Sequence, residues 1–254
     1  MNKREEYFDG AYRFRAPGCT VSKKASPEVF VFQMLMRQTG NEAGRTDLKP
    51  GKKLYVGTSK SYNINRYLES DGKDFRAKGS KWEKFGYDQK HIKKDIKFID
   101  RGMKPLPADI RVSRYVYGEQ LGIMLGDSDR INNNSINGFI SDLRAGDKNV
   151  RNEFRSMLAS TVYNHKGYVS TTYVRRHPSF DLRSVRLDLV VKRGTKAIMT
   201  NNHTEHEVLL QRDLKLYFTG RFCIITTRKG VDQLVIEACA AMEEPEPEML
   251  KIPA

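Results

Sequence analysis

The chain reads IRVSRYVY over residues 110–117, and the order of apolar and polar residues in this stretch predicts a β-strand. Ile110 and Val112 alternate with more polar residues at the period of two that a strand requires. Arg114 continues the apolar side of this alternation. Because an arginine is unfavourable to bury unless an anion or a carboxylate meets it, Arg114 is a candidate for binding an anionic ligand.

The segments on the two sides of this strand differ in kind. Residues 61–101 are polar and basic with loosely spaced apolar residues, which predicts short amphipathic helices, and the basic run Lys90–Lys97 is typical of a solvated helix face. Helical periodicity returns over Phe154–Val162 and ends near Gly167. Short strand-like runs then follow from Tyr168 to Ala238. Helices early and strands late predict an α+β fold rather than a doubly wound one.

The composition narrows the class of protein. The 254 residues carry 45 Lys and Arg against 31 Asp and Glu, and the net charge of +14 attracts nucleic acid, anionic cofactors, acidic proteins or anionic membrane surfaces. No apolar run reaches the roughly 20 residues of a transmembrane helix, and the charged N-terminus lacks the pattern of a secretory signal. We therefore expect a location in the cytoplasm, either of the producing cell or of a cell into which the protein is delivered.

Several other patterns carry no chemistry. Three scattered cysteines and the absence of zinc-ligand spacing argue against a disulfide framework and against a metal site. Residues 57–61 read GTSKS, which lacks the spacing of a phosphate-binding P-loop. Gly118, Gly122 and Gly126 have small-residue spacing outside any apolar span, which favours a loop or a turn.

Two later stretches carry hydroxyl and carboxylate groups. Residues 170–172 read Ser-Thr-Thr in a predicted strand, and residues 205–207 read Glu-His-Glu directly before the apolar run Val208–Leu210. The period of two puts Glu205 and Glu207 on one face, so both carboxylates would project into a cleft. Each stretch alone is ordinary, and the combination with Arg114 is the informative feature.

In chain order, these features resemble the mono-ADP-ribosyltransferases of the arginine, Ser-Thr-Ser, Glu-x-Glu class, which includes clostridial binary actin-modifying toxins and phage host-modifying enzymes. The similar segments are residues 110–114, residues 167–172 with Thr172 replacing the last serine, and residues 187–195 with 205–210. The resemblance extends over about residues 60–230. It implies an ADP-ribosyltransferase-like fold of two roughly perpendicular antiparallel sheets with flanking helices, and NAD in the cleft.

The resemblance also implies roles for the site residues. Arg114 would bind a phosphate of NAD, the co-substrate. Glu207 would hydrogen-bond the ribose 2′-hydroxyl and stabilise the positive charge that develops on the sugar as the bond to nicotinamide breaks. Ser170 would orient Glu207 and, with Thr171, form part of the NAD-binding motif.

Weaker expectations concern residues whose positions depend on loops. Phe180 and Arg183 fall where related toxins keep a ring against nicotinamide and a second phosphate-binding arginine, although Phe180 is equally consistent with a core side chain. Tyr115 stands where glycine is frequent in the family. Arg111 competes with Arg114 for the phosphate-binding role if the strand register differs by an odd step.

Glu205 would select the acceptor. In the resembled family, a glutamate two residues before the catalytic one goes with arginine as the target, because a carboxylate can pair with a guanidinium and help to remove its proton. The expected activity is therefore transfer of ADP-ribose from NAD to an arginine of a target protein. The expected partners are NAD and that protein, with an acidic or nucleic-acid-associated surface as one option for the target, and no metal is required.

Three alternatives stay open. The same chemistry with water as acceptor would make the protein an NAD glycohydrolase toxin. A basic nucleic-acid-binding protein without enzyme activity would use Lys and Arg on phosphates and tyrosines on bases, and the run Lys90–Lys97 is one candidate contact. RNA as the acceptor of ADP-ribose also stays open.

The expected domain organisation has three parts. Residues 1–60 form an N-terminal extension packed on the core, residues 61–242 form the catalytic domain, and residues 243–254 form a flexible acidic tail rich in Glu and Pro.

Overall fold

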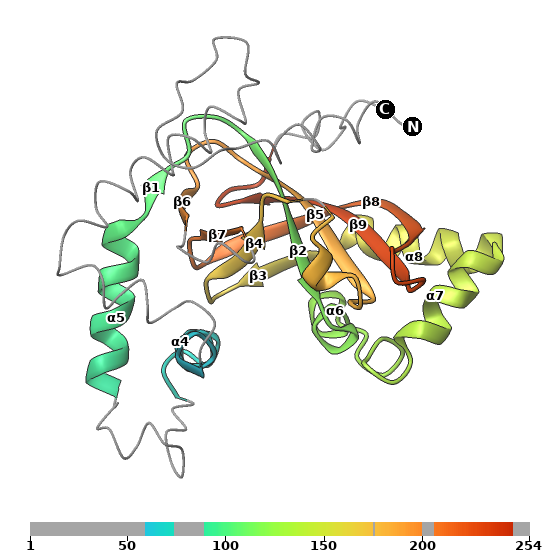
Figure 1. Cartoon of the computed structure of the whole chain (residues 1–254), viewed down its shortest axis with the longest axis horizontal. Coiled ribbons are helices and arrows are strands. Elements are labelled where there is room, and N and C mark those ends of the chain that lie inside the picture. The colour runs from blue at the N-terminus through green and yellow to red at the C-terminus, as the bar shows by residue number, and fades with distance from the viewer. Residues whose placement is uncertain (1–58, 74–88, 175, 200–205, 246–254) are drawn as a thin grey trace.

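The computed structural model describes residues 59–73, 89–174, 176–199 and 206–245 (Figure 1). Its helices are α4 (Ser59–Glu69), α5 (Gln89–Gly102), α6 (Gly118–Leu125), α7 (Ile136–Ala145) and α8 (Lys148–Ser160), with a short 3-10 helix, η3 (Pro178–Phe180). Its strands are β1 (Lys104–Pro105), β2 (Ile110–Val116), β3 (Val162–His165), β4 (Val169–Thr172), β5 (Val185–Val191), β6 (Lys196–Met199), β7 (Glu207–Leu210), β8 (Leu214–Thr226) and β9 (Asp232–Ala241). Nearly all of the expected N-terminal extension and acidic tail lies outside the described residues.

The strands form one mixed sheet in the order β1-β6-β7-β4-β2-β5-β9-β8-β3, which together with the helices confirms the α+β class. The two roughly perpendicular antiparallel sheets that were expected are two halves of one hydrogen-bonded sheet, in which β5 and β9 pair in parallel. The halves are joined weakly: β2 pairs with β4 at Ser113↔Thr172, whereas it pairs with β5 along its whole length. Figure 1 shows β2 crossing β4 steeply at this junction.

A short connection brings the far edge of the sheet back to its middle. The edge strand β3 is separated from the central strand β4 by residues 166–168 alone, so the two strands lie close together (Figure 1). The Arg114 side chain of β2 links the two strands, because it reaches His165 on β3 and the backbone of Ser170 on β4. The curl of the sheet thus brings side chains from β2, β3, β4 and β7 together.

Apolar side chains fill clusters on both faces of β7. Val208 and Leu210 belong to the larger cluster, to which α6, α7 and α8 contribute, while Leu209 belongs to a second cluster with residues of α4 and α5. Of the short amphipathic helices expected before β2, the described residues show α4 and α5, and the lysines of the run Lys90–Lys97 are exposed on α5. Their apolar faces hold the half of the sheet that contains β4 and β7.

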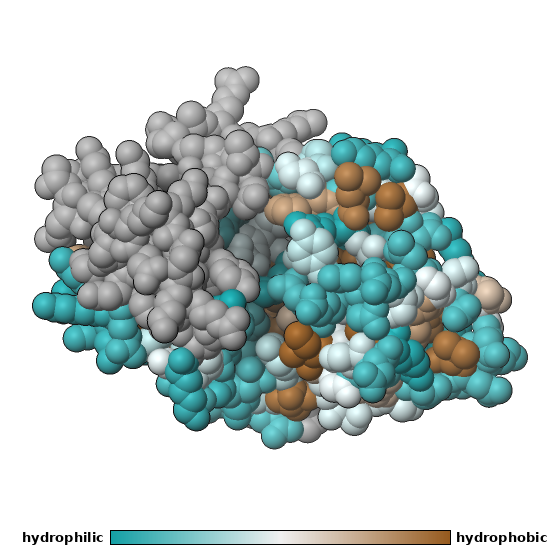
Figure 2. Space-filling view, turned by 90° about the horizontal axis from the view of Figure 1, so that it is seen from below, coloured by the Kyte–Doolittle hydropathy of each residue, from teal (hydrophilic) through white to brown (hydrophobic). Residues whose placement is uncertain are grey.

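Among the described residues, few large apolar side chains are exposed. Figure 2 shows a face that is mostly hydrophilic, with apolar residues in scattered patches, which is usual for a protein surface. Among the described residues, no helix combines the length and apolar character that crossing a bilayer requires.

The predicted helix ending near Gly167 is wrong at its C-terminal end. Helix α8 ends at Ser160, Thr161 has an extended backbone, and residues 162–165 form β3. β3 pairs with β8 from Val162↔Tyr217 to His165↔Leu214. Tertiary strand pairing therefore overrides the helical spacing of the apolar residues. Within the region where short strand-like runs were expected, β8 is one long strand with an irregularity between Phe218 and Phe222.

The predicted glycine turn is also wrong, because Gly118 and Gly122 lie inside α6 and Gly126 alone ends it, with a left-handed φ of 70°. The chain after α6 folds back over the helix. A Cβ atom at Gly122 would lie 1.9 Å from the carbonyl oxygen of Ile131, and one at Gly118 would lie 2.5 Å from that of Asn132. The spacing of these glycines therefore permits close packing of helix and loop.

Candidate active site

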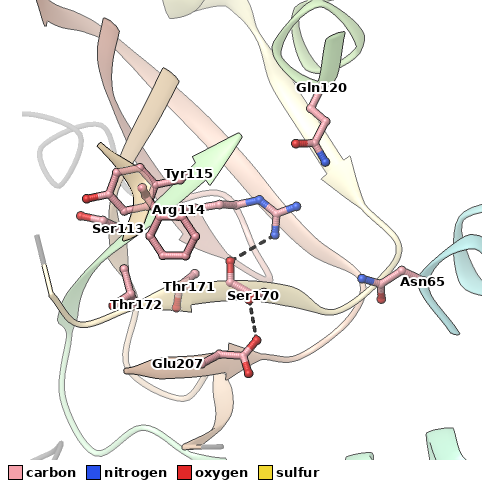
Figure 3. Close-up of a pocket in the computed structure, with 10 residues that line it drawn as sticks. Asn65, Ser113, Arg114, Tyr115, Gln120, Ser170, Thr171, Thr172 and Glu207 are labelled. Atoms are coloured by element: carbon pink, nitrogen blue, oxygen red, sulfur yellow. Dashed lines mark hydrogen bonds between the residues drawn. The ribbon is translucent and has the colours of Figure 1, made fainter. Parts of the chain in front are cut away.

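A cavity of about 180 Å³ opens beside the crossing of β2 and β4. Its lining comes from α4, β2, α6, β4, η3 and β7, which are far apart in sequence (Figure 3). The lining residues are Asn65, Ser113, Arg114, Tyr115, Gln120, Ser170, Thr171, Thr172, Phe180 and Glu207. Five of the residues singled out in the sequence, Arg114, Ser170, Thr171, Phe180 and Glu207, therefore line one cavity.

Glu207 is the first residue of β7 and is 5% exposed. The Ser170 hydroxyl on β4 donates a hydrogen bond to its Oε1 atom at 2.5 Å (Figure 3). In the antiparallel ladder Ser170 pairs with Leu209 and Thr172 pairs with Glu207, so these side chains share a face and Ser170 reaches Glu207 diagonally. The strand pairing thus fixes the carboxylate in the wall of the cavity.

The two threonines after Ser170 use their hydroxyl groups within the protein. Thr171 donates to the carbonyl oxygen of Val208 at 2.6 Å, which ties β4 to β7. Thr172 accepts from the backbone N–H of Val174 at 3.1 Å. The second bond supports the turn after β4, which gives Thr172 a local task where the resembled motif has serine.

Arg114 supplies the positive charge of the cavity. Its Nη1 atom donates to the carbonyl oxygen of Ser170 at 3.4 Å, and its Nη2 atom lies 3.1 Å from Nε2 of His165. The competing candidate, Arg111, is on the same strand as Arg114 and pairs with Val190 of β5. It is not among the residues that line this cavity. The observed strand register therefore favours Arg114 over Arg111 as the anion-binding residue.

Two aromatic rings form another part of the wall. The Phe180 ring stacks on Tyr115 with centroids 4.7 Å apart and an interplanar angle of 21°. The Tyr115 hydroxyl accepts from the backbone N–H of His177 at 3.1 Å, and burial is the main cause that raises the pKa of Tyr115. Phe180 therefore faces the cavity on a rigid tyrosine support, rather than lying in the apolar core.

A pair of histidines connects the turn that carries Phe180 to the start of β7. Nε2 of His177 lies 3.2 Å from Nδ1 of His206, while Nδ1 of His177 accepts from the Ser179 N–H at the same distance. The accepting Nδ1 leaves the proton on Nε2, so His177 donates to His206. His206 has a left-handed φ of 51° directly before Glu207. The bond couples the wall around Phe180 to the segment that presents the carboxylate.

One residue singled out in the sequence, Arg183, does not join this group. The Arg183 guanidinium stacks over the Tyr117 ring at 3.6 Å, and Arg183 is not among the residues that line the cavity. Glu205 lies outside the described residues. Their suggested roles in phosphate binding and acceptor choice stay predictions.

Sequence reasoning missed lining residues that come from distant elements. The Asn65 side chain on α4 makes two hydrogen bonds with the backbone of Tyr168. Its Oδ1 atom accepts from the Tyr168 N–H at 2.9 Å, and its Nδ2 atom donates to the Tyr168 carbonyl oxygen at 3.2 Å. Gln120 comes from the first turn of α6. Neither residue belongs to a motif, so their places depend on the tertiary fold. His165 also carried no signal beyond its residue type.

The cavity combines three chemical functions. Arg114 suits a phosphate, stacked Phe180 and Tyr115 suit a planar ring, and the fixed Glu207 carboxylate suits a sugar that gains positive charge. A dinucleotide with a glycosidic bond to a pyridine base, such as NAD, matches this set.

Comparisons with known proteins agree with this chemistry. Residues 50–243 match the model of a family described as ADP-ribosyltransferase exoenzyme. Among curated proteins, none matches the chain by sequence.

Solved structures share the fold at low sequence identity. Plx2a, an ADP-ribosyltransferase toxin from Paenibacillus larvae, is 21% identical with a TM-score of 0.59, over 84% of this chain and 96% of that one. The Clostridium limosum C3 exoenzyme is 19% identical with a TM-score of 0.57, over 83% and 92%. The ADP-ribosylating toxin BECa of C. perfringens, solved with NADH, is 16% identical with a TM-score of 0.60, over 84% of this chain but 48% of BECa.

At these identities the structural likeness establishes the fold, and the family match establishes the class of enzyme. The matched region contains every lining residue of the cavity. The chain belongs to the ADP-ribosyltransferase exoenzyme family, a family of toxin transferases that use NAD as the co-substrate.

Proposed function

We propose that this enzyme transfers ADP-ribose from NAD to an arginine side chain of a target protein. The observation that carries the NAD chemistry is the Glu207 carboxylate, held at 2.5 Å by Ser170 in the cavity that Arg114 also lines. In the reaction, the bond between ribose C1 and the nicotinamide nitrogen breaks, and its electron pair leaves with nicotinamide. A guanidinium nitrogen of the target then bonds to C1 and loses a proton.

Each residue has a defined task in this proposal. Arg114 binds a phosphate of NAD, Phe180 packs against the nicotinamide ring, and Glu207 stabilises the positive sugar while it hydrogen-bonds the ribose 2′-hydroxyl. Ser170 keeps the Glu207 carboxylate in its orientation.

Glu205 would decide the acceptor. Support comes from the sequence Glu-His-Glu, because a carboxylate two residues before Glu207 can pair with an incoming guanidinium and accept its proton. The arginine target is therefore the part of the proposal that most needs a direct test.

The test compares Glu205→Gln with Glu207→Gln. Each protein is incubated with NAD labelled in the adenosine part and with a bacterial or a eukaryotic lysate. Labelled proteins are identified and the modified residue is mapped by mass spectrometry, while nicotinamide release is measured without lysate. We expect the unaltered enzyme to label arginine, Glu205→Gln to release nicotinamide without labelling arginine, and Glu207→Gln to do neither.

Other outcomes separate the alternatives. Retention of arginine labelling by Glu205→Gln would refute the role of Glu205. Nicotinamide release by the unaltered enzyme without any labelled macromolecule would identify an NAD glycohydrolase, and label removed by ribonuclease would identify RNA as the acceptor. Fractionation of producing cells and of exposed target cells, with the protein detected in each fraction, would test the cytoplasmic location.

A further inference from the structure

His165, at the end of β3, is 3% exposed and touches the arginine of the cavity. Its Nδ1 atom lies 3.0 Å from the carbonyl oxygen of Gly167, and its Nε2 atom lies 3.1 Å from Nη2 of Arg114. A carbonyl oxygen can only accept a hydrogen bond, and a guanidinium can only donate one. The contacts therefore put the imidazole proton on Nδ1 and leave Nε2 as the acceptor for Arg114.

The surroundings keep this imidazole neutral. Burial and then the charge of Arg114 lower the pKa of His165 to about 3. The Tyr163 ring packs edge-on against the imidazole with centroids 5.9 Å apart. At neutral pH the ring is thus an uncharged acceptor with one defined tautomer.

Neutral acceptors hold Arg114 in a way that suits anion binding. Both the His165 ring and the Ser170 carbonyl orient the guanidinium without cancelling its charge. A carboxylate in the place of His165 would neutralise the arginine and compete with a phosphate. One carboxylate, Glu69 on α4, does act on Arg114 from a distance: burial raises the pKa of Glu69, and Arg114 lowers it.

We propose that His165 is a positioning residue for co-substrate binding, whose neutral imidazole directs the Arg114 guanidinium toward the phosphates of NAD. This inference rests on the proposed role of Arg114 as a phosphate ligand. It assigns His165 an effect on binding of the phosphate part of NAD, with no contact to the bond that breaks.

A matched pair of variants separates the two hydrogen bonds of the ring. The side-chain amide group of Asn lies about as far from the backbone as the Nδ1 atom of His, and the amide group of Gln lies about as far as the Nε2 atom. His165→Asn therefore keeps a donor for Gly167 and loses the acceptor for Arg114, whereas His165→Gln keeps the acceptor and loses that donor.

Calorimetry with NAD and with ADP, and inhibition by nicotinamide, give the readouts. We expect His165→Asn to weaken NAD and ADP binding about tenfold, as for loss of one charge-assisted hydrogen bond. The KM for NAD should rise in parallel, while kcat and inhibition by nicotinamide stay within about twofold. His165→Gln should bind NAD and ADP nearly as the unaltered enzyme does.

Equal losses in both variants would overturn the proposal, since the ring would then only support the turn before β4. Unchanged ADP binding in both would overturn it as well. Arg114→Ala separates this failure from that of the proposed function: if Arg114→Ala also binds ADP normally, the phosphate role of Arg114 is wrong. If Arg114→Ala alone loses affinity, only the role of His165 is wrong.

A measurement on the unaltered protein does not depend on whether the variants fold. Nitrogen-15 NMR of the His165 imidazole should show a protonated Nδ1 and an unprotonated Nε2 at neutral pH, with a change at Nε2 when ADP binds. A doubly protonated ring, or a proton on Nε2, would contradict the proposal because neither form can accept from Arg114.

Discussion

At the scale of single residues, the register of two neighbouring strands decides which side chains meet. Thr172 pairs with Glu207, and Ser170, two residues before Thr172, lies on the same face of β4. The Ser170 hydroxyl therefore reaches the Glu207 carboxylate diagonally and donates a hydrogen bond to it at 2.5 Å. A shift of one residue in β7 would turn Glu207 to the opposite face, and the same shift in β4 would turn Ser170 away from it. The chemistry therefore depends on the apolar residues Val208 and Leu210, whose burial fixes that register.

The two arginines of β2 provide a test at this scale. Arg114→Ala should raise the KM for NAD about tenfold or more, because it removes the positive charge from the cavity wall. Arg111→Ala is the matched control on the same strand and should leave the KM unchanged, since Arg111 is outside the cavity lining. Steady-state nicotinamide release over a range of NAD concentrations measures both, and the reverse pattern would move the phosphate-binding role to Arg111.

At the scale of elements, α6 and the chain that covers it show how packing overrides local preference. The first turn of α6 presents Gln120 to the cavity, and residues 128–132 pack against the helix at Gly118 and Gly122. Asp127 N–H donates to the Gly122 carbonyl at 2.9 Å, and Ile131 N–H donates to Asp127 at 2.9 Å. Glycine at position 122 allows this approach at the expense of helix propensity.

Gly122→Ala and Gly138→Ala form a matched pair that tests this packing. An added Cβ at Gly122 would meet the Ile131 carbonyl at 1.9 Å, whereas none of the surroundings lies within 4 Å of one at Gly138 in α7. We expect Gly122→Ala to lower the free energy of unfolding by about 2 kcal/mol or more. Gly138→Ala should raise it by about 0.5–1 kcal/mol, because alanine favours the helix. Urea denaturation measures both, and equal stabilities would contradict the packing described here.

At the scale of the whole molecule, the periodic and ordered features were predictable and the long-range ones were not. The alternation from Ile110, the apolar run at Val208–Leu210 and the motif order predicted the strands and the family. The end of α8 could not be predicted from the sequence, because residues 162–165 form a strand only through their pairing with β8. Asn65 and His165 belong to no motif: two hydrogen bonds to the Tyr168 backbone hold Asn65 at the cavity, and the fold of the sheet brings His165 to Arg114. The roles of Glu205 and Arg183 remain predictions.

The buried His165 also predicts a pH dependence of stability for the whole fold. Its pKa falls from an ordinary value of 6.5 to about 3 in the folded protein, so the unfolded chain binds the proton more readily. The free energy of unfolding should therefore decrease as the pH falls from 6.5 toward 3, by roughly 1 kcal/mol per pH unit from this group. His165→Gln removes the group, and the difference between the two denaturation series should show that slope. Parallel series would contradict a neutral buried imidazole.

The central claim is that Glu207, fixed by Ser170, stabilises the sugar as its bond to nicotinamide breaks. The most direct measurement compares nicotinamide release and calorimetric NAD binding for Glu207→Gln and the unaltered enzyme. Release should fall by at least about 100-fold, while the dissociation constant for NAD changes only a few-fold, because the lost interaction is strongest in the transition state. A Glu207→Gln enzyme that releases nicotinamide within about tenfold of the original rate would contradict the claim.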